Sequence, residues 1–243
     1  WSRDGSFFVF ASNRDASGDR AENRAASNRN GSGGRNEDQL YYMRPDGGEA
    51  QRLTDAEEGV SDFAFSRDGL WFVYRSGLSG QEQLFRLPID GMLTADAEQL
   101  TDASAGIDQW EWAPDSRSIY FMRPDSRNED EVLRRESGFT VDIKNMLTPL
   151  SNLWVLELGP SFARQLTNDP NLSVTGFNIS EDGRWITFTG GSTERYERNI
   201  TSQRLYQDQF LLETANGQIE RLTENYEVSE SGASISPDGR WIA

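Results

Sequence analysis

The chain of 243 residues contains no histidine and no cysteine, which restricts the chemistry that its side chains can perform. A Ser-His-Asp triad needs an imidazole to accept the serine proton, and zinc sites in proteins rely on histidine and cysteine. The nearest approach to a nucleophile elbow is the stretch Gly159 to Ala163 around Ser161. It lacks the final glycine and lies between two predicted strands of one hairpin. We therefore predict no catalytic residue, no metal site and no cofactor in this chain.

Two acidic stretches are candidates for a ligand site. Asp15 to Asp19 faintly resembles a calcium loop, but it lacks the ligand spacing and the closing glutamate of such a loop. Glu129 and Glu131 flank Asp130, and paired carboxylates of this kind could bind a cation or an amino group. Because the chain carries a net charge of −16, a solvated acidic surface is the simpler interpretation. Glu129 and Glu131 stay as candidate substrate-binding residues.

The overall charge also restricts the partners. Forty acidic residues against 24 basic ones leave no basic excess, and binding to nucleic acid phosphates needs a basic surface. The longest apolar run, Phe7 to Ala11, is far shorter than the roughly 20 residues that a membrane-spanning helix requires. We expect no nucleic acid partner and no membrane insertion. Without cysteines the compartment stays open, and bacterial periplasm and cytoplasm are equally compatible with the composition.

Any ligand site must be carried by elements that repeat along the sequence. The stretch Ser61 to Thr101 predicts four short strands joined by tight turns, one of them at Asp68-Gly69. The same turn recurs around Asp4, Asp68, Asp115, Asp182 and Asp238. The last strand of each unit ends in a Leu-Thr pair, at Leu53-Thr54, Leu100-Thr101, Leu166-Thr167 and Leu222-Thr223. Four strands in a repeat of about 40 to 50 residues are typical of a β-propeller blade.

The predicted fold is therefore all-β, a β-propeller segment with about four blades of four antiparallel strands and a partial fifth. The expected blades cover residues 1–54, 60–101, 107–167, 174–223 and 228–243. The first blade lacks most of its inner strand, and the last contains only its first two strands. Since both ends carry a second strand, they duplicate rather than complete each other, and we expect a segment of a larger propeller.

Three blades carry an insertion, and all three insertions fall between the second and third strands, at Asn13–Asp38, Pro124–Asn152 and Gly190–Asp208. The first is of low complexity and predicts a mobile loop. In an up-and-down blade these connections should emerge at one end of the propeller. Because function concentrates in loops on a rigid scaffold, this end is the predicted contact surface. The alternative is that the insertions only reflect tolerance of a solvated rim.

Aromatic and β-branched residues alternate along the second strand of each blade. Phe8 and Phe10, Phe72 and Tyr74, Ile119 and Phe121, and Ile186 and Phe188 share one face, with Trp71 and Trp185 on the other. Blades of a propeller pack face to face, so both sets are expected to be buried. A role in stacking on a ligand is the less favoured interpretation.

The repeat Ser236 to Ala243, of the form Ser-Pro-Asp-Gly-Arg-Trp-Ile-Ala, together with the Leu-Thr ending, resembles the TolB-type propeller repeat. That repeat is shared by TolB and by the N-terminal propellers of the prolyl oligopeptidase family of serine peptidases. Arg134 to Asp142, followed by Ser151 to Val155, resembles the central inserted blade of dipeptidyl-peptidase and acylaminoacyl-peptidase relatives. Glu194 to Asp208, continuing into Leu222 to Glu227, is similar to bacterial members of that family.

The resemblance implies that this chain is the non-catalytic propeller of a serine peptidase and limits which peptide substrates reach an α/β-hydrolase domain beyond Ala243. Dipeptidyl peptidases hold the substrate's N-terminus with two glutamates of the propeller. Glu129 and Glu131 lack the Tyr-Glu-Glu context of that motif, so the role is not transferred to them. Two alternatives stay open: a TolB-like protein-interaction propeller of the cell envelope, and a propeller attached to another hydrolase, such as an amidohydrolase.

Overall fold

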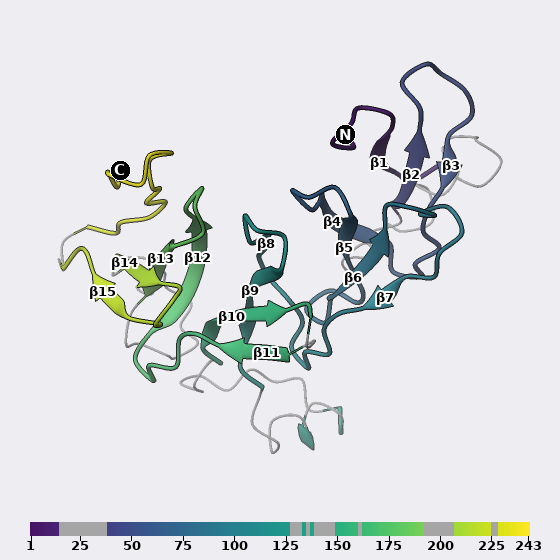
Figure 1. Ribbon diagram of the computed structural model, residues 1–243. Helices are drawn as coiled ribbons and strands as arrows, with labels where there is room; N and C mark the ends of the chain where they lie inside the picture. The colour runs from purple at the N-terminus through teal and green to yellow at the C-terminus, as the bar shows by residue number, and fades with distance from the viewer. Residues whose placement is uncertain are drawn as a thin grey trace. The chain divides into compact units, whose positions relative to one another are not determined.

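The computed structural model describes residues 1–14, 38–126, 133–134, 137–138, 149–159, 162–191, 207–224 and 228–243. They form two compact units, residues 1–107 and residues 108–243, whose strands are labelled in Figure 1. Among the described residues only Leu133 and Arg134 are helical, and the other regular elements are strands. In this part of the chain no helix is long and apolar enough to cross a membrane.

The first unit contains two antiparallel sheets. Blade 1 has three strands in the order β1-β2-β3, as expected for a blade without its inner strand. Blade 2 has four strands in the order β4-β5-β6-β7. Their bounds are β1 Phe8–Ser12, β2 Gln39–Met43, β3 Gln51–Arg52, β4 Val60–Phe65, β5 Trp71–Ser76, β6 Gln83–Pro88 and β7 Glu98–Gln99.

The second unit contains two four-stranded antiparallel sheets and the beginning of a third. Blade 3 has the order β11-β10-β9-β8, and blade 4 the order β12-β13-β14-β15. Their bounds are β8 Trp110–Trp112, β9 Ser118–Pro124, β10 Ser151–Glu157, β11 Phe162–Gln165, β12 Ser173–Ile179, β13 Trp185–Gly191, β14 Gln207–Glu213 and β15 Ile219–Arg221. After blade 4, one antiparallel bridge joins Ile235 to Ile242.

The last strand of each blade is shorter than the sequence pattern predicts, and the Leu-Thr pair explains why. In blade 1 the backbone N–H of Leu53 donates to the carbonyl of Leu40 at 2.7 Å, while the N–H of Leu40 donates to the hydroxyl of Thr54 at 2.9 Å. The threonine side chain thus replaces the backbone acceptor of the next ladder position. The equivalent threonine hydroxyl accepts a backbone N–H in each of the other blades. The donor and acceptor are Leu84 and Thr101 in blade 2 (3.0 Å), Leu153 and Thr167 in blade 3 (3.0 Å), and Gln209 and Thr223 in blade 4 (2.9 Å).

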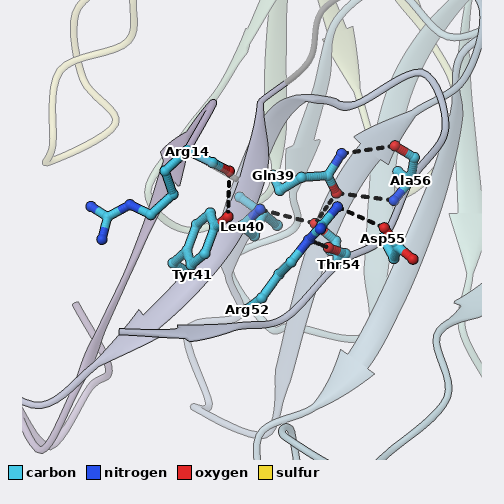
Figure 2. A network of polar contacts seen from close by, with 8 residues as sticks. All are labelled: Arg14, Gln39, Leu40, Tyr41, Arg52, Thr54, Asp55 and Ala56. Atoms are coloured by element: carbon cyan, nitrogen blue, oxygen red, sulfur yellow. Dashed lines mark hydrogen bonds and ion pairs between the residues drawn. The ribbon is translucent and has the colours of Figure 1, made fainter. Parts of the chain in front are cut away.

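A buried amide completes this contact in the first blades. In blade 1 the side-chain oxygen of Gln39 accepts hydrogen bonds from the Thr54 hydroxyl and the Ala56 N–H. Its side-chain nitrogen donates to the Ala56 carbonyl at 2.7 Å (Figure 2). Gln83 makes the equivalent three bonds in blade 2. Buried polar groups must be paired to be tolerated, and here one side chain pairs both the threonine and the chain that leaves the blade.

The Asp-Gly turns form as the sequence predicts. In blade 2 the Asp68 carboxylate accepts the backbone N–H of Leu70 at 3.0 Å, two residues on, and the Ser66 hydroxyl at 2.6 Å. Gly69 has a positive φ of 75°, which glycine adopts at little cost. Blade 3 departs from this pattern, because Ser116 occupies the glycine position at a φ of 60°.

Both units have an apolar core, and the expected second-strand residues of blades 2 to 4 are buried in the structure. Phe72, Ile119 and Ile186 are 0% exposed. The prediction was wrong for Phe8 and Phe10, which are only half-buried. Phe7, directly before β1, and Val9 within it face the core instead, and the Phe7 ring lies 5.8 Å from that of Phe65 in blade 2.

The prediction that Trp71 and Trp185 are buried was also wrong, since both are half-buried. The guanidinium of Arg86 lies 4.3 Å from the centre of the Trp71 ring, and that of Arg184 lies 5.9 Å from the Trp185 ring. A charged side chain can cover an aromatic face while keeping contact with water. These indoles are therefore stabilised by arginines at a partly solvated surface.

Side-chain amides and hydroxyls join the blades of the second unit. The Gln109 amide donates to the Phe177 carbonyl at 2.7 Å and accepts the Phe177 N–H at 3.1 Å. Thr187 and Asn178 donate to the Ala233 carbonyl at 2.7 and 3.0 Å, which ties residues 228–243 to blade 4. Hydrogen bonds of this kind fix the position of one blade edge on the next.

Candidate functional site

The insertions of blades 3 and 4 leave the second unit at the same end. Pro124, the last residue of β9, pairs with Ser151, the first residue of β10, across the neck of the blade 3 insertion. The Ser151 N–H donates to the Ser173 hydroxyl at 3.1 Å. Ser173 in turn pairs with Gly191, the last residue of β13 before the blade 4 insertion. The prediction that these two insertions emerge together is therefore confirmed within the second unit.

An arginine lies on an indole at this insertion end. Arg123 is the next-to-last residue of β9, and its guanidinium carbon lies 3.7 Å from the centre of the Trp154 ring of β10. The two residues share one face of the sheet because Trp154 pairs with Phe121, two positions before Arg123. Phe121 is buried and stacks with Trp154 at 6.5 Å between ring centroids. The buried phenyl ring thereby supports the indole, and the indole supports the guanidinium.

The hydrogen-bonding groups of Arg123 are not used within the described part of the chain. No oxygen of the described residues accepts a hydrogen bond from its guanidinium, and no carboxylate there lies within ion-pair distance. Asp125, the acid whose charge acts on Arg123, accepts a hydrogen bond from the side-chain amide of Asn152 at 2.9 Å. Burial lowers the pKa of Arg123 below its ordinary value, and the negative charge of Asp125 partly opposes that shift. A half-buried cation is thus stacked on an indole, and its donors have no partner in the described part of the chain.

The same blade contains other buried donors that lack partners. The indole nitrogens of Trp110 and Trp154 and the hydroxyl of Ser151 are buried without a hydrogen bond. Within residues 1–14 and 38–107 no buried side-chain nitrogen or oxygen is left in this state. Native proteins rarely leave such groups unpaired, so these donors need partners outside the described residues, such as ordered water or a ligand.

This arrangement is suited to binding a hydrogen-bond acceptor, in particular a negatively charged one. A guanidinium presents parallel N–H groups in a fixed plane, which matches the two oxygens of a carboxylate. Among the described residues no cluster of acidic side chains could hold a metal ion. The described part of the insertion end thus offers hydrogen-bond donors and a positive charge.

The residues singled out from the sequence are not among those that the structure describes. Glu129 and Glu131, like Ser161 and the stretch Asp15 to Asp19, are outside the described residues, so the assignment of the two glutamates stays a prediction. The sequence interpretation missed Arg123 and Trp154. One signal was present: Arg123 is a charged residue directly after the aliphatic and aromatic run Ile119 to Met122, where a strand that is buried on both faces should stay apolar.

Comparison with known proteins agrees with the predicted repeat. No protein-family model matches the chain. An uncharacterized protein from Agrobacterium fabrum is 29% identical over 181 residues, which cover 72% of this chain and 50% of that protein. Dipeptidyl-peptidase 5 from Porphyromonas endodontalis is 20% identical over 228 residues, which cover 84% of this chain and 32% of that protein. The chain thus spans between a third and a half of the length of these relatives.

Solved structures give the same result at the level of the fold. A structure described as TolB from Agrobacterium tumefaciens matches with a TM-score of 0.51 and 16% identity, covering 94% of this chain and 65% of that one. The acylaminoacyl peptidase of Pyrococcus horikoshii matches with a TM-score of 0.51 and 17% identity, covering 77% of this chain and 28% of that one. The chain is an all-β segment with the propeller fold. The predicted resemblance to TolB and to the propellers of prolyl-peptidase relatives is confirmed as a likeness of fold.

Proposed function

We propose that this chain is the propeller portion of a serine peptidase of the prolyl oligopeptidase family. In this proposal it is non-catalytic and positions peptide substrates for an α/β-hydrolase domain encoded beyond Ala243. The match to dipeptidyl-peptidase 5 along 84% of the chain carries the proposal, because it is a match in sequence to a protein whose name states an activity. The fold shared with an acylaminoacyl peptidase points the same way.

The chain's own residues support a positioning role. It has no histidine, so a serine nucleophile in it would lack an imidazole base. The end of the second unit that carries two insertions also presents the Arg123–Trp154 stack, and the guanidinium of Arg123 has no hydrogen-bond partner among the described residues. A rigid scaffold that offers a fixed donor can select which peptides approach a neighbouring catalytic centre.

The test uses the full-length gene product and a fluorophosphonate probe, which reacts with activated serines. We expect labelling of one serine C-terminal to residue 243, within a Gly-x-Ser-x-Gly sequence and followed by a histidine. Residues 1–243 expressed alone should show neither labelling nor release of nitroaniline from peptide substrates. A full-length protein without a reactive serine would contradict the proposal, as would a fragment that cleaves peptides and loses this activity on Ser161→Ala.

A TolB-like interaction propeller is the second candidate, and the match to a TolB structure over 94% of the chain favours it. The two candidates differ in one measurable property. An interaction module should form a stable complex with another protein and should have no reactive serine in its full-length form. Affinity purification of the full-length protein from its own cells, followed by serine labelling of the same sample, separates the two.

A further inference from the structure

We propose that the Arg123–Trp154 stack is a binding site for a carboxylate group of a peptide ligand. The peptide part of this inference rests on the proposed function, whereas the carboxylate part rests on geometry alone. The carboxylate can come from an acidic side chain or from the C-terminus of the peptide. Both sources present the same two oxygens to the guanidinium.

The stack fixes the orientation of the guanidinium. With its guanidinium carbon 3.7 Å from the centre of the indole ring, Arg123 has one face covered by Trp154, and its N–H edges point along the plane of the group. Ordering an arginine in one position normally costs side-chain entropy on binding, and a preformed stack removes part of that cost. The arrangement is therefore suited to two parallel hydrogen bonds from a planar anion.

The chain itself shows which group fits such a stack. In blade 2, Arg86 covers Trp71 at 4.3 Å, and its guanidinium nitrogen Nε lies 2.7 Å from a carboxylate oxygen of Glu98. Arg86 and Arg123 both stack on a tryptophan of the neighbouring strand of the same sheet. Blade 2 supplies its own carboxylate, and among the described residues blade 3 supplies none. The Glu98 carboxylate is the internal template for the missing ligand.

Electrostatics add to the selectivity. The chain has a net charge of −16, so its long-range field repels anions, and a local cation is needed to hold one. Arg123 is half-buried, and attraction between charges is stronger where water is partly excluded. The charge of Asp125 acts on Arg123, but the Asp125 carboxylate accepts the Asn152 amide at 2.9 Å and forms no ion pair with the guanidinium. A ligand carboxylate would therefore meet an ordered cation whose donors are not engaged by Asp125.

Four short peptides test the inference: Ac-Ala-Ala-Glu-NH₂, Ac-Ala-Ala-Gln-NH₂, Ac-Ala-Ala-Ala-OH and Ac-Ala-Ala-Ala-NH₂. Their affinities for the full-length protein are measured by isothermal titration calorimetry, with propionate as a non-peptide carboxylate probe. We expect at least one carboxylate-bearing peptide to bind about tenfold or more tightly than its uncharged partner, as charged hydrogen bonds allow. The pair that shows this preference identifies the source of the carboxylate.

The variants assign the effect to the stack. Arg123→Gln should abolish the preference for carboxylate, and Arg123→Lys should retain only part of it, because a lysine keeps the charge and loses the paired donors. The matched control is Arg86→Gln, which removes a stacked arginine whose carboxylate partner is internal and should leave the preference unchanged. Near-UV circular dichroism of each variant checks that the fold is retained, and Arg123→Lys keeps the test valid if Arg123→Gln does not fold.

The outcomes separate this inference from the proposed function. Peptides that bind equally well with and without a carboxylate, or a preference that survives Arg123→Gln, would overturn the inference and leave the propeller's role in a peptidase untouched. Binding of propionate that depends on Arg123, without binding of any peptide, would support the carboxylate site and overturn its assignment to peptides.

Discussion

Blades 2 and 3 have the same strand order and the same Leu-Thr ending, yet they differ in how completely they satisfy their own polar groups. In blade 2 the stacked Arg86 has Glu98 as a partner, and the turn has both Ser66 and Gly69. In blade 3 the stacked Arg123 has no carboxylate partner among the described residues, and two indole nitrogens are buried without hydrogen bonds.

The difference teaches where this fold can carry function. A blade that pairs all its polar groups internally is a structural unit and offers little to a ligand. Donors left open on an ordered surface cost stability unless something outside the blade pairs with them. Among the described residues, the departures of blade 3 from the repeat, next to an insertion, are the observations behind the carboxylate site proposed above.

The largest expected effect on stability comes from removing Trp154, the indole on which Arg123 stacks in blade 3. Trp154→Ala should lower the free energy of unfolding by about 2 to 3 kcal/mol, because the ring packs on the buried Phe121 in a central strand. Trp154→Phe should cost much less, since it keeps a ring and removes the unpaired indole N–H. Urea denaturation measures both, and a loss for Trp154→Phe equal to that for Trp154→Ala would show that the indole nitrogen is paired after all.

Replacing the arginines compares the two stacks directly. Arg86→Met should lower the free energy of unfolding by about 1 kcal/mol, since it removes a stacking contact and an ion pair whose Glu98 side chain is 53% exposed. Arg123→Met should change it by less than about 0.5 kcal/mol without ligand, because the cost of desolvating an unpaired charge offsets the stacking. Equal losses in urea denaturation would mean that Arg123 has a partner of its own.

A third test transfers the turn of blade 3 into blade 2. Gly69→Ser places at a φ of 75° the residue type that blade 3 carries as Ser116, and it should lower the free energy of unfolding by roughly 0.5 to 1 kcal/mol. Gly69→Asn is the control, because asparagine tolerates positive φ better and should cost less. Thermal unfolding monitored by circular dichroism compares the two, and an unchanged midpoint for Gly69→Ser would show that the turn relaxes to another conformation.

The smallest effect concerns the turn serine, which blade 3 replaces by Ala113. In blade 4 the Asp182 carboxylate accepts hydrogen bonds from the Ser180 hydroxyl and from the backbone N–H of Arg184. Both bonds hold the pKa of Asp182 below the ordinary value of 3.8, and the Ser180 bond has the larger effect. A carboxyl group whose pKa is lower in the folded than in the unfolded state stabilises the fold at pH values above its unfolded pKa. That stabilisation is lost as the pH falls from 3.8 through the folded pKa. Ser180→Ala should raise the pKa of Asp182 toward 3.8 in an NMR titration of side-chain carboxyls. An unshifted titration would assign the effect to the backbone N–H alone.

The sequence by itself determined the strands, their antiparallel order and the place of the insertions. Strand alternation depends on local periodicity, and the Asp-Gly turn depends on contacts within a few residues, as the bond between Asp68 and Leu70 illustrates. The Leu-Thr pair could be recognised in the sequence as the end of each repeat, but its structural role could not. Only the structure shows that the threonine hydroxyl takes the place of a backbone carbonyl in the ladder.

Tertiary structure alone decided which face of each strand is buried and which polar groups meet. Phe7 and Val9 rather than Phe8 and Phe10 enter the core of the first unit, because burial depends on which face meets the next blade. The Arg123–Trp154 stack joins residues that are separated in sequence by an insertion and are brought together by strand register. The charge of Arg123 after an apolar run was visible in the sequence, but its pairing with Trp154 could be found only once the strands were aligned.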